Sequence, residues 1–116
     1  MVLTRHFKET ILARLERDPE FCRELLKEGI DSLLSGDLGT AKAVLRDYIN
    51  ATIGFPELGR QTSKSPKSLM RMFGPSGNPR TQNLFEIIGC LQRHEGVQFR
   101  VESAFEQERA DAEVNV

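Results

Sequence analysis

The residues with the clearest potential for chemistry lie between positions 65 and 71, where basic and polar side chains alternate with apolar ones. Leu69, Met72 and Phe73 recur at helical spacing, which predicts a short helix with one buried side. An arginine on the opposite side can donate two parallel hydrogen bonds to guanine, worth about 1–3 kcal/mol of discrimination between bases. A lysine there reaches a base or a phosphate, and apolar side chains contact a thymine methyl group. The outward side, with Pro66, Lys67, Met70 and Arg71, is therefore predicted to enter the major groove of DNA. Spacing alone leaves open a plain helical hairpin whose basic side is simply solvated.

Further residues around this helix are predicted to contact the DNA backbone. Lys64 and Ser65 stand at the N-terminal edge of the outward side, and the serine hydroxyl with the free N–H groups beside it can hold a phosphate. Arg60 lies on the outer side of the preceding helix. Arg80 falls in the first turn of the helix that follows, near where the backbone of the DNA would pass. The predicted DNA-binding set therefore adds Arg60, Lys64, Ser65 and Arg80 to the four groove-facing residues.

Two short helices and a longer third one must position these side chains. Residues 56–62 form the first, residues 62–64 the turn, and a Ser-Pro pair at 65–66 supplies a hydroxyl cap and a preset backbone angle for the second. Gly59 is predicted to lie where the first two helices approach closely. After a loop at 74–77, Asn78 and Pro79 are predicted to start the third helix. Its core face is predicted to consist of Leu84, Phe85, Ile87, Ile88 and Leu91.

The N-terminal part reads as a helical support. Apolar spacing predicts helices over residues 5–17, from Pro19 to about Leu34, and over residues 38–51. Asp18 and Asp37 are predicted to cap the second and third of these. The second helix is predicted to bury Phe21, Cys22, Leu25, Leu26, Ile30, Leu33 and Leu34. The third is predicted to bury Leu38, Ala41, Leu45, Tyr48 and Ile49, with Val44 flanking.

The C-terminal part has a different pattern. Residues 97–101 alternate apolar and polar side chains, which predicts a strand that needs a partner from a second copy or another protein. The predicted pairing residues are Val97, Phe99 and Val101. A homodimer formed in this way would match a palindromic operator. The domain prediction is a helical region at 1–53, a DNA-binding unit at 54–94, a pairing strand at 95–101 and a disordered acidic tail at 102–116.

Composition limits the function classes. Residues 55–100 carry seven basic and three acidic side chains, and residues 101–116 carry one basic and five acidic, which suits a polyanion partner at one surface. His6 and His94 stand alone, so no catalytic residue, metal site or cofactor is expected, and the chain is predicted not to be an enzyme. Cys22 and Cys90 are expected to be buried free thiols. No membrane span or signal peptide is expected, which predicts a cytoplasmic protein.

The stretch at 54–94 resembles the lambda-repressor-like helix-turn-helix of the addiction-module antidote proteins, the HigA-like antitoxins. The resemblance spans residues 32–101 and rests on residues 57–62, residues 65–73, the Gly77-Asn78-Pro79 sequence, Leu84, Leu91, Gly36-Asp37, Leu45 and residues 53–55. It implies an all-α bundle of five to six helices with a short C-terminal β-strand. It also implies an antitoxin of a type II toxin–antitoxin module that binds double-stranded operator DNA, represses its own operon and neutralises a RelE-like toxin.

Two residues depart from the family pattern. Ser63 stands where the family has glycine, so it must adopt the same turn, with a positive φ as one option. Lys64 stands where the family has an apolar residue, and its stem can lie across the gap between the helices. The alternative interpretation is an interaction module that does not read DNA and grips a partner through its N-terminal helices or C-terminal strand.

Overall fold

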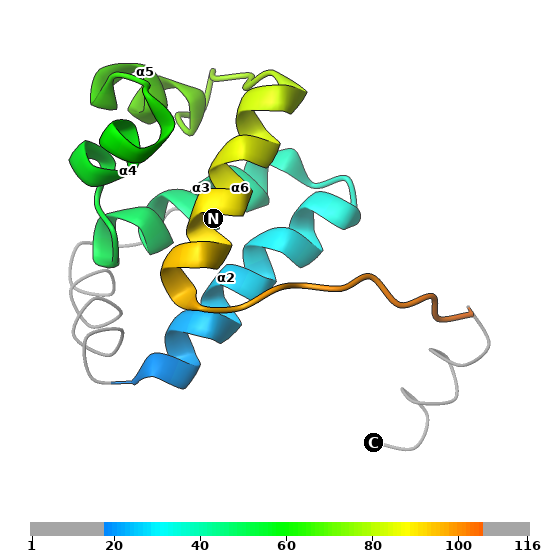
Figure 1. The fold of residues 1–116 in the computed structure, drawn as a ribbon. Helices are drawn as coiled ribbons and strands as arrows, with labels where there is room; N and C mark the ends of the chain where they lie inside the picture. Colours follow the sequence, from blue (N-terminus) through cyan, green and yellow to red (C-terminus); the bar gives the residue numbers. More distant parts are fainter. Residues whose placement is uncertain (1–17, 106–116) are drawn as a thin grey trace, which may run out of the picture.

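A computed structural model describes residues 18–105, and this part of the chain contains five helices and no strand. In chain order the helices are α2 (Pro19–Leu34), α3 (Leu38–Ala51), α4 (Phe55–Thr62), α5 (Pro66–Met72) and α6 (Thr81–Glu95) (Figure 1). The prediction of an all-helical fold is therefore confirmed for the described residues. The helix predicted over residues 5–17 lies outside them.

Two aspartates begin α2 and α3, as the sequence predicts. The Oδ1 atom of Asp18 accepts a hydrogen bond from the backbone N–H of Phe21 at 3.2 Å, and Asp37 does the same for Thr40 at 3.1 Å. A carboxylate in this position satisfies one free N–H group and suits the positive end of the helix dipole. Both helices then pack along one another and support the shorter helices (Figure 1).

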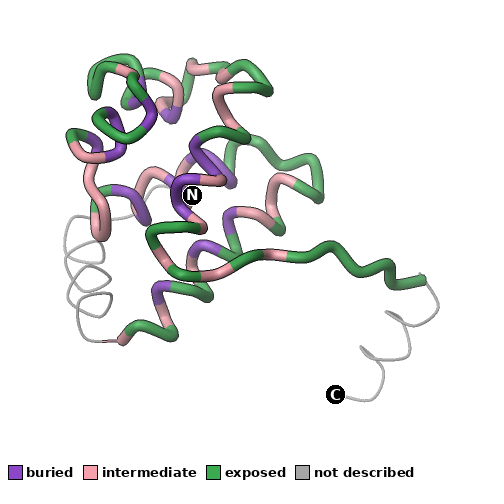
Figure 2. The backbone as a smooth tube through the Cα atoms, viewed as in Figure 1, coloured by how far each residue is buried: buried purple, intermediate pink, exposed green. Residues whose placement is uncertain are grey.

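The core lies where the five helices converge (Figure 2). Its fully buried side chains come from every described helix and include Leu26, Leu45, Tyr48, Ile49, Leu58, Leu69, Ile87 and Leu91. Phe73, just after α5, joins them, and its ring centroid lies 6.3 Å from that of Phe55. Because each helix contributes at least one of these side chains, no helix can shift without opening the shared core.

A buried polar contact joins α3 to the end of α6. The Tyr48 side chain is fully buried, and its hydroxyl donates a hydrogen bond to Oε1 of Glu95. Burial is the main reason why the pKa of Tyr48 lies well above its ordinary value, and the hydrogen bond and negative charge of Glu95 raise it further. The hydroxyl therefore stays protonated in the folded protein and can continue to donate.

Three apolar side chains predicted to be buried are exposed instead. The exposed fractions are 64% for Leu34, 36% for Leu38 and 65% for Phe85. Since a helix turns about 100° per residue, Phe85 lies well outside the sector shared by Leu84, Ile87, Ile88 and Leu91. Leu34 and Leu38 flank the turn between α2 and α3, at the last and first residues of these helices. The predicted apolar faces were therefore too wide.

The strand predicted at residues 97–101 is not formed among the described residues. α6 ends at Gly96, whose φ is 73°, and the chain continues in irregular conformation. Val97 and Phe99 pack against the core of their own chain, and the backbone N–H of Phe99 donates to Oε1 of Gln92 at 2.8 Å. Val101 remains 78% exposed. The alternation of apolar and polar residues thus reflects which side chains contact α6 and the core. It does not reflect pairing with another strand among the described residues.

Tyr48 gives the fold a measurable dependence on pH. The folded-state pKa lies above the unfolded value near 10, so its contribution to stability is complete below pH 10 and declines as the pH rises above it. Tyr48→Phe is expected to lower the free energy of unfolding by about 1–3 kcal/mol at neutral pH, because a hydrogen bond to a carboxylate is lost. The variant is also expected to weaken the alkaline decline, measured by urea unfolding at a series of pH values.

Tyr48 is the single tyrosine of the chain, so the absorbance of tyrosinate reports on it alone. We expect this absorbance to rise only when the helical circular dichroism is lost. Ionisation near pH 10 with the helical signal intact would contradict the buried hydrogen bond to Glu95.

Candidate nucleic-acid interface

α4 and α5 are joined by a three-residue connection and cross at Gly59. A Cβ atom at Gly59 would lie 2.5 Å from the carbonyl oxygen of Lys64 and 3.4 Å from Cδ of Pro66. The first of these distances is too short for a side chain at position 59 to be accommodated without displacing the backbone. The close approach predicted at Gly59 is confirmed, and it fixes how the start of α5 lies against α4.

The connection begins with Ser63, which has φ 57° and ψ 40°. Ser63 is the one non-glycine residue with a positive φ among residues 18–105. The turn is closed by the backbone N–H of Lys64, which donates to the carbonyl of Gly59 at 3.0 Å. Ser63 therefore adopts the positive φ that was expected as one option for this turn.

Lys64 lies across the gap between the helices and contacts α6. Its side chain is only 16% exposed, and its Nζ atom lies 2.9 Å from Oε2 of Glu86 and 3.4 Å from the carbonyl of Thr62. The stem thus covers the turn, as expected for a lysine at an apolar position. Since Glu86 offsets its charge, Lys64 contributes less positive field to the surface than the sequence implied.

α5 has one buried side and one exposed side. Leu69 is fully buried, Phe73 is 1% exposed, and Met72 packs against the same core, as predicted. The hydroxyl of Ser65 accepts a hydrogen bond from the N–H of Ser68 at 3.1 Å and caps the helix. The outward residues are all exposed and are Ser65, Pro66, Lys67, Met70 and Arg71.

Lys67 and Arg71 are adjacent on the exposed side of α5, because residues four apart lie one above the other on a helix. Neither forms a hydrogen bond or ion pair through its side chain within the described part of the chain. An exposed cation with no carboxylate beside it keeps its full attraction for a phosphate or a base edge. These two side chains are therefore the most available cations of α4 and α5.

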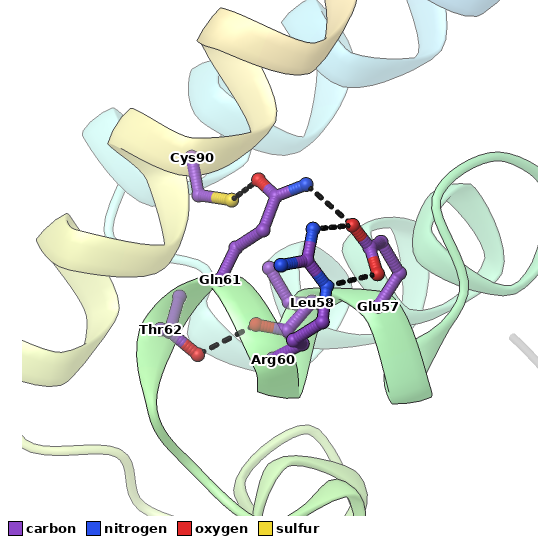
Figure 3. A network of polar contacts seen from close by, with 6 residues as sticks. All are labelled: Glu57, Leu58, Arg60, Gln61, Thr62 and Cys90. Carbon is purple, nitrogen blue, oxygen red and sulfur yellow. Dashed lines mark hydrogen bonds and ion pairs between the residues drawn. The ribbon is translucent and has the colours of Figure 1, made fainter.

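Arg60 lies on the neighbouring helix α4 and, unlike Lys67 and Arg71, is paired with a carboxylate (Figure 3). Its Nε atom donates to Oε2 of Glu57 at 2.8 Å, and a second N–H group binds the other carboxylate oxygen. This bidentate contact, with a further hydrogen bond from Gln61, lowers the pKa of Glu57 to about 2. Gln61 in turn accepts a hydrogen bond from the thiol of Cys90 at 3.1 Å. Arg60 is thus held in place, but its charge is largely offset.

Arg80 is exposed and stands directly before α6. The prediction that Asn78 and Pro79 start this helix was wrong by two residues. Arg80 has an extended backbone with ψ 146°, so helical angles begin only at Thr81. Figure 1 shows α5 and the start of α6 at the same end of the molecule, so Arg80 lies toward the end that carries α5.

One residue that the sequence did not single out is Lys42. It is 7% exposed, and its ammonium donates to three carbonyl oxygens in the loop after α5. Lys42 lies three positions before Leu45 and seven before Ile49, on the apolar stripe of α3. A lysine on an apolar stripe was the available signal, although the stripe alone does not identify the acceptors.

Other predicted features can be placed briefly. Cys22 and Cys90 are buried, as predicted, and form no disulfide among residues 18–105; burial is the main cause that raises the pKa of each. Residues 18–105 contain no cluster of histidine, cysteine, aspartate and glutamate side chains that could hold a metal ion. In the same residues, no helix has the length and apolar character needed to cross a membrane.

The chain matches no protein-family model, no curated protein and no solved structure.

The conformation of Ser63 leads to a stability prediction. A non-glycine residue in the left-handed region costs roughly 1 kcal/mol, so Ser63→Gly is expected to raise the free energy of unfolding by up to that amount. The side chain is exposed, so little contact is lost. The matched control is Ser68→Gly within α5, which should lower the free energy of unfolding by about 0.5–1 kcal/mol. Urea unfolding of the two variants measures both effects, and destabilisation by Ser63→Gly would contradict the turn geometry.

Proposed function

We propose that this protein is a sequence-specific DNA-binding transcriptional regulator in which α4 and α5 form a helix-turn-helix. The observation that carries the proposal is the exposed side of α5, where Lys67 and Arg71 lie adjacent without an acidic partner while Leu69 on the opposite side is fully buried. A helix held rigidly on one side and cationic on the other suits the major groove.

The dimensions support this assignment. An α-helix with its side chains is about 10–12 Å in diameter, so α5 can enter a major groove that is about 12 Å wide. Arg71 is assigned the bidentate contact with a guanine, and Lys67 a base edge or a phosphate. Met70, which is 50% exposed, and Pro66 offer apolar contact to a thymine methyl group.

The remaining candidates are assigned to contacts with the DNA backbone. They differ in whether their side chains are already paired within the protein. Arg80 is exposed and has no ion pair among the described residues, so it is the strongest of them. Arg60 is already bound to Glu57 through two of its five N–H groups, which leaves others for a phosphate. Lys64 forms an ion pair with Glu86, so its main role is to stabilise the turn. Ser65 is exposed at the N-terminal end of α5.

From the resemblance to the HigA-like antitoxins we also propose a role for the protein in the cell. The protein would act in the cytoplasm as the antitoxin of a type II module, bind its own operator as a homodimer and neutralise a RelE-like toxin. The backbone at residues 100–104 forms neither helix nor strand and Val101 is exposed, so this segment is available to pair with a second copy.

The same segment favours a second candidate function, which is an interaction module that does not read DNA. Val101 and Phe105 are 78% and 73% exposed. Two of the predicted DNA contacts, Arg60 and Lys64, are already paired with acidic side chains. In this alternative the chain grips a protein partner through the C-terminal segment or the N-terminal helices, and α5 has no role in binding.

A mobility-shift titration with duplexes covering the DNA upstream of the protein's own coding sequence distinguishes the two functions. Lys67→Ala combined with Arg71→Ala is expected to weaken binding by about 10- to 100-fold, because the bidentate base contact and a second cation are lost. The slope of log K against log salt should fall in magnitude by up to about 1, since the single phosphate contact assigned to Lys67 contributes roughly 0.9.

The matched control combines Arg23→Ala with Lys27→Ala on α2, which removes one exposed arginine and one exposed lysine from another surface. The control pair should leave the affinity and the salt slope nearly unchanged. Equal effects of the two pairs would show that only net charge matters and would overturn the assignment of α5. Co-purification of a basic partner, with no retardation of DNA at low salt, would support the interaction module instead.

A further inference from the structure

Lys42 of α3 directs a buried ammonium group at the loop between α5 and α6. Its Nζ atom lies 3.0 Å from the carbonyl oxygen of Gly74, 3.3 Å from that of Pro75 and 2.7 Å from that of Gly77. An ammonium has three N–H donors, so these three acceptors occupy all of them. Because a buried cation is unfavourable unless its donors are satisfied, the contact favours a single arrangement of the loop.

The loop itself is folded tightly against the end of α5. The N–H of Gly74 donates to the carbonyl of Arg71 at 3.1 Å, and the N–H of Gly77 donates to the carbonyl of Gly74 at 3.0 Å. A Cβ atom at Gly77 would lie 2.1 Å from the carbonyl oxygen of Arg71 and 2.6 Å from that of Met72. The backbone of the loop thus rests on the last turn of α5, and Lys42 holds it there from the other side.

This arrangement sets the spacing of two candidate DNA contacts. α4 packs against both α5 and α6, while the loop at 73–80 is the direct connection from α5 to α6. Arg71 lies at the end of α5 just before the loop, and Arg80 at its far end before α6. The core and α4 place the two helices, and Arg80 is tied to α6 because its carbonyl accepts a hydrogen bond from the N–H of Leu84 at 2.9 Å. The path of the loop adds to these contacts in setting how the backbone enters Arg80, and so where its side chain lies relative to Arg71.

We propose that Lys42 is a positioning residue for DNA binding, which holds the loop so that Arg71 and Arg80 engage one duplex at the same time. This inference rests on the proposed function of α5. Lys42 is buried and acts through the loop, without touching the DNA. Its loss then weakens binding in protein that is still folded, which a purely stabilising contact would not do.

The test compares Lys42→Met with Tyr48→Phe, at a temperature where circular dichroism shows both to be folded. Each variant removes a tertiary hydrogen-bonding group of α3, but Tyr48 contacts Glu95 at the other end of α6. With the upstream duplexes as the probe, Lys42→Met is expected to lower affinity about tenfold and the magnitude of the salt slope by about 1, as if one phosphate contact were lost. Tyr48→Phe should retain the affinity and slope of the unmodified protein.

A double-mutant cycle with Arg80→Ala tests the coupling directly. Arg80→Ala should weaken binding in the unmodified background and have much less effect in Lys42→Met, because Arg80 is then already misplaced. Lys42→Gln serves as a second variant, since its amide retains two donors on a shorter side chain and should give an intermediate loss.

The outcomes separate the two claims. Absence of any DNA retardation by the unmodified chain would overturn the proposed function, and this inference with it. Wild-type affinity and salt slope in folded Lys42→Met, or additive effects with Arg80→Ala, would overturn the inference alone. Failure of both Lys42 variants to fold would limit Lys42 to a role in folding and would equally overturn it.

Discussion

A helix of seven residues is too short to persist by itself in water, so α5 depends on what its buried side contacts. Leu69 is fully buried and Phe73 nearly so, and both belong to the core shared by the described helices. The absence of a side chain at Gly59 lets the start of α5 lie directly against α4. Once this side is fixed, Lys67 and Arg71 must face solvent.

Local signals in the sequence were sufficient for much of the fold. The bounds of α3, the aspartate caps and the close approach at Gly59 follow from helical spacing, side-chain hydrogen-bonding capacity and the lack of a Cβ atom. Errors arose where contacts depend on neighbours far away in the sequence. Phe85 lies outside the sector shared by the buried residues of α6, and no other described helix covers it, so it stays 65% exposed.

In the candidate interface, too, some features follow from local spacing and others from contacts between distant parts of the chain. The exposure of Lys67 and Arg71 follows from helical periodicity within α5, and that much could be predicted. The pairing of Lys64 with Glu86 joins residues far apart in the chain, and the hydrogen bonds from Lys42 to the loop after α5 span an even longer separation. Such contacts depend on the packing of whole helices, which no local pattern encodes. Among the cations of the predicted DNA-binding set, Lys67, Arg71 and Arg80 thus have no ion pair within residues 18–105, whereas Arg60 and Lys64 are paired with carboxylates.

The central claim is that the exposed side of α5 meets DNA. The most direct measurement is a titration of isotope-labelled protein with the upstream duplex, in which backbone amide chemical shifts are followed by nuclear magnetic resonance. The account predicts that the largest changes map to α5, to the turn before it and to Arg80. Changes confined to α2, to α3 or to residues 97–105, or no changes at low salt, would contradict it.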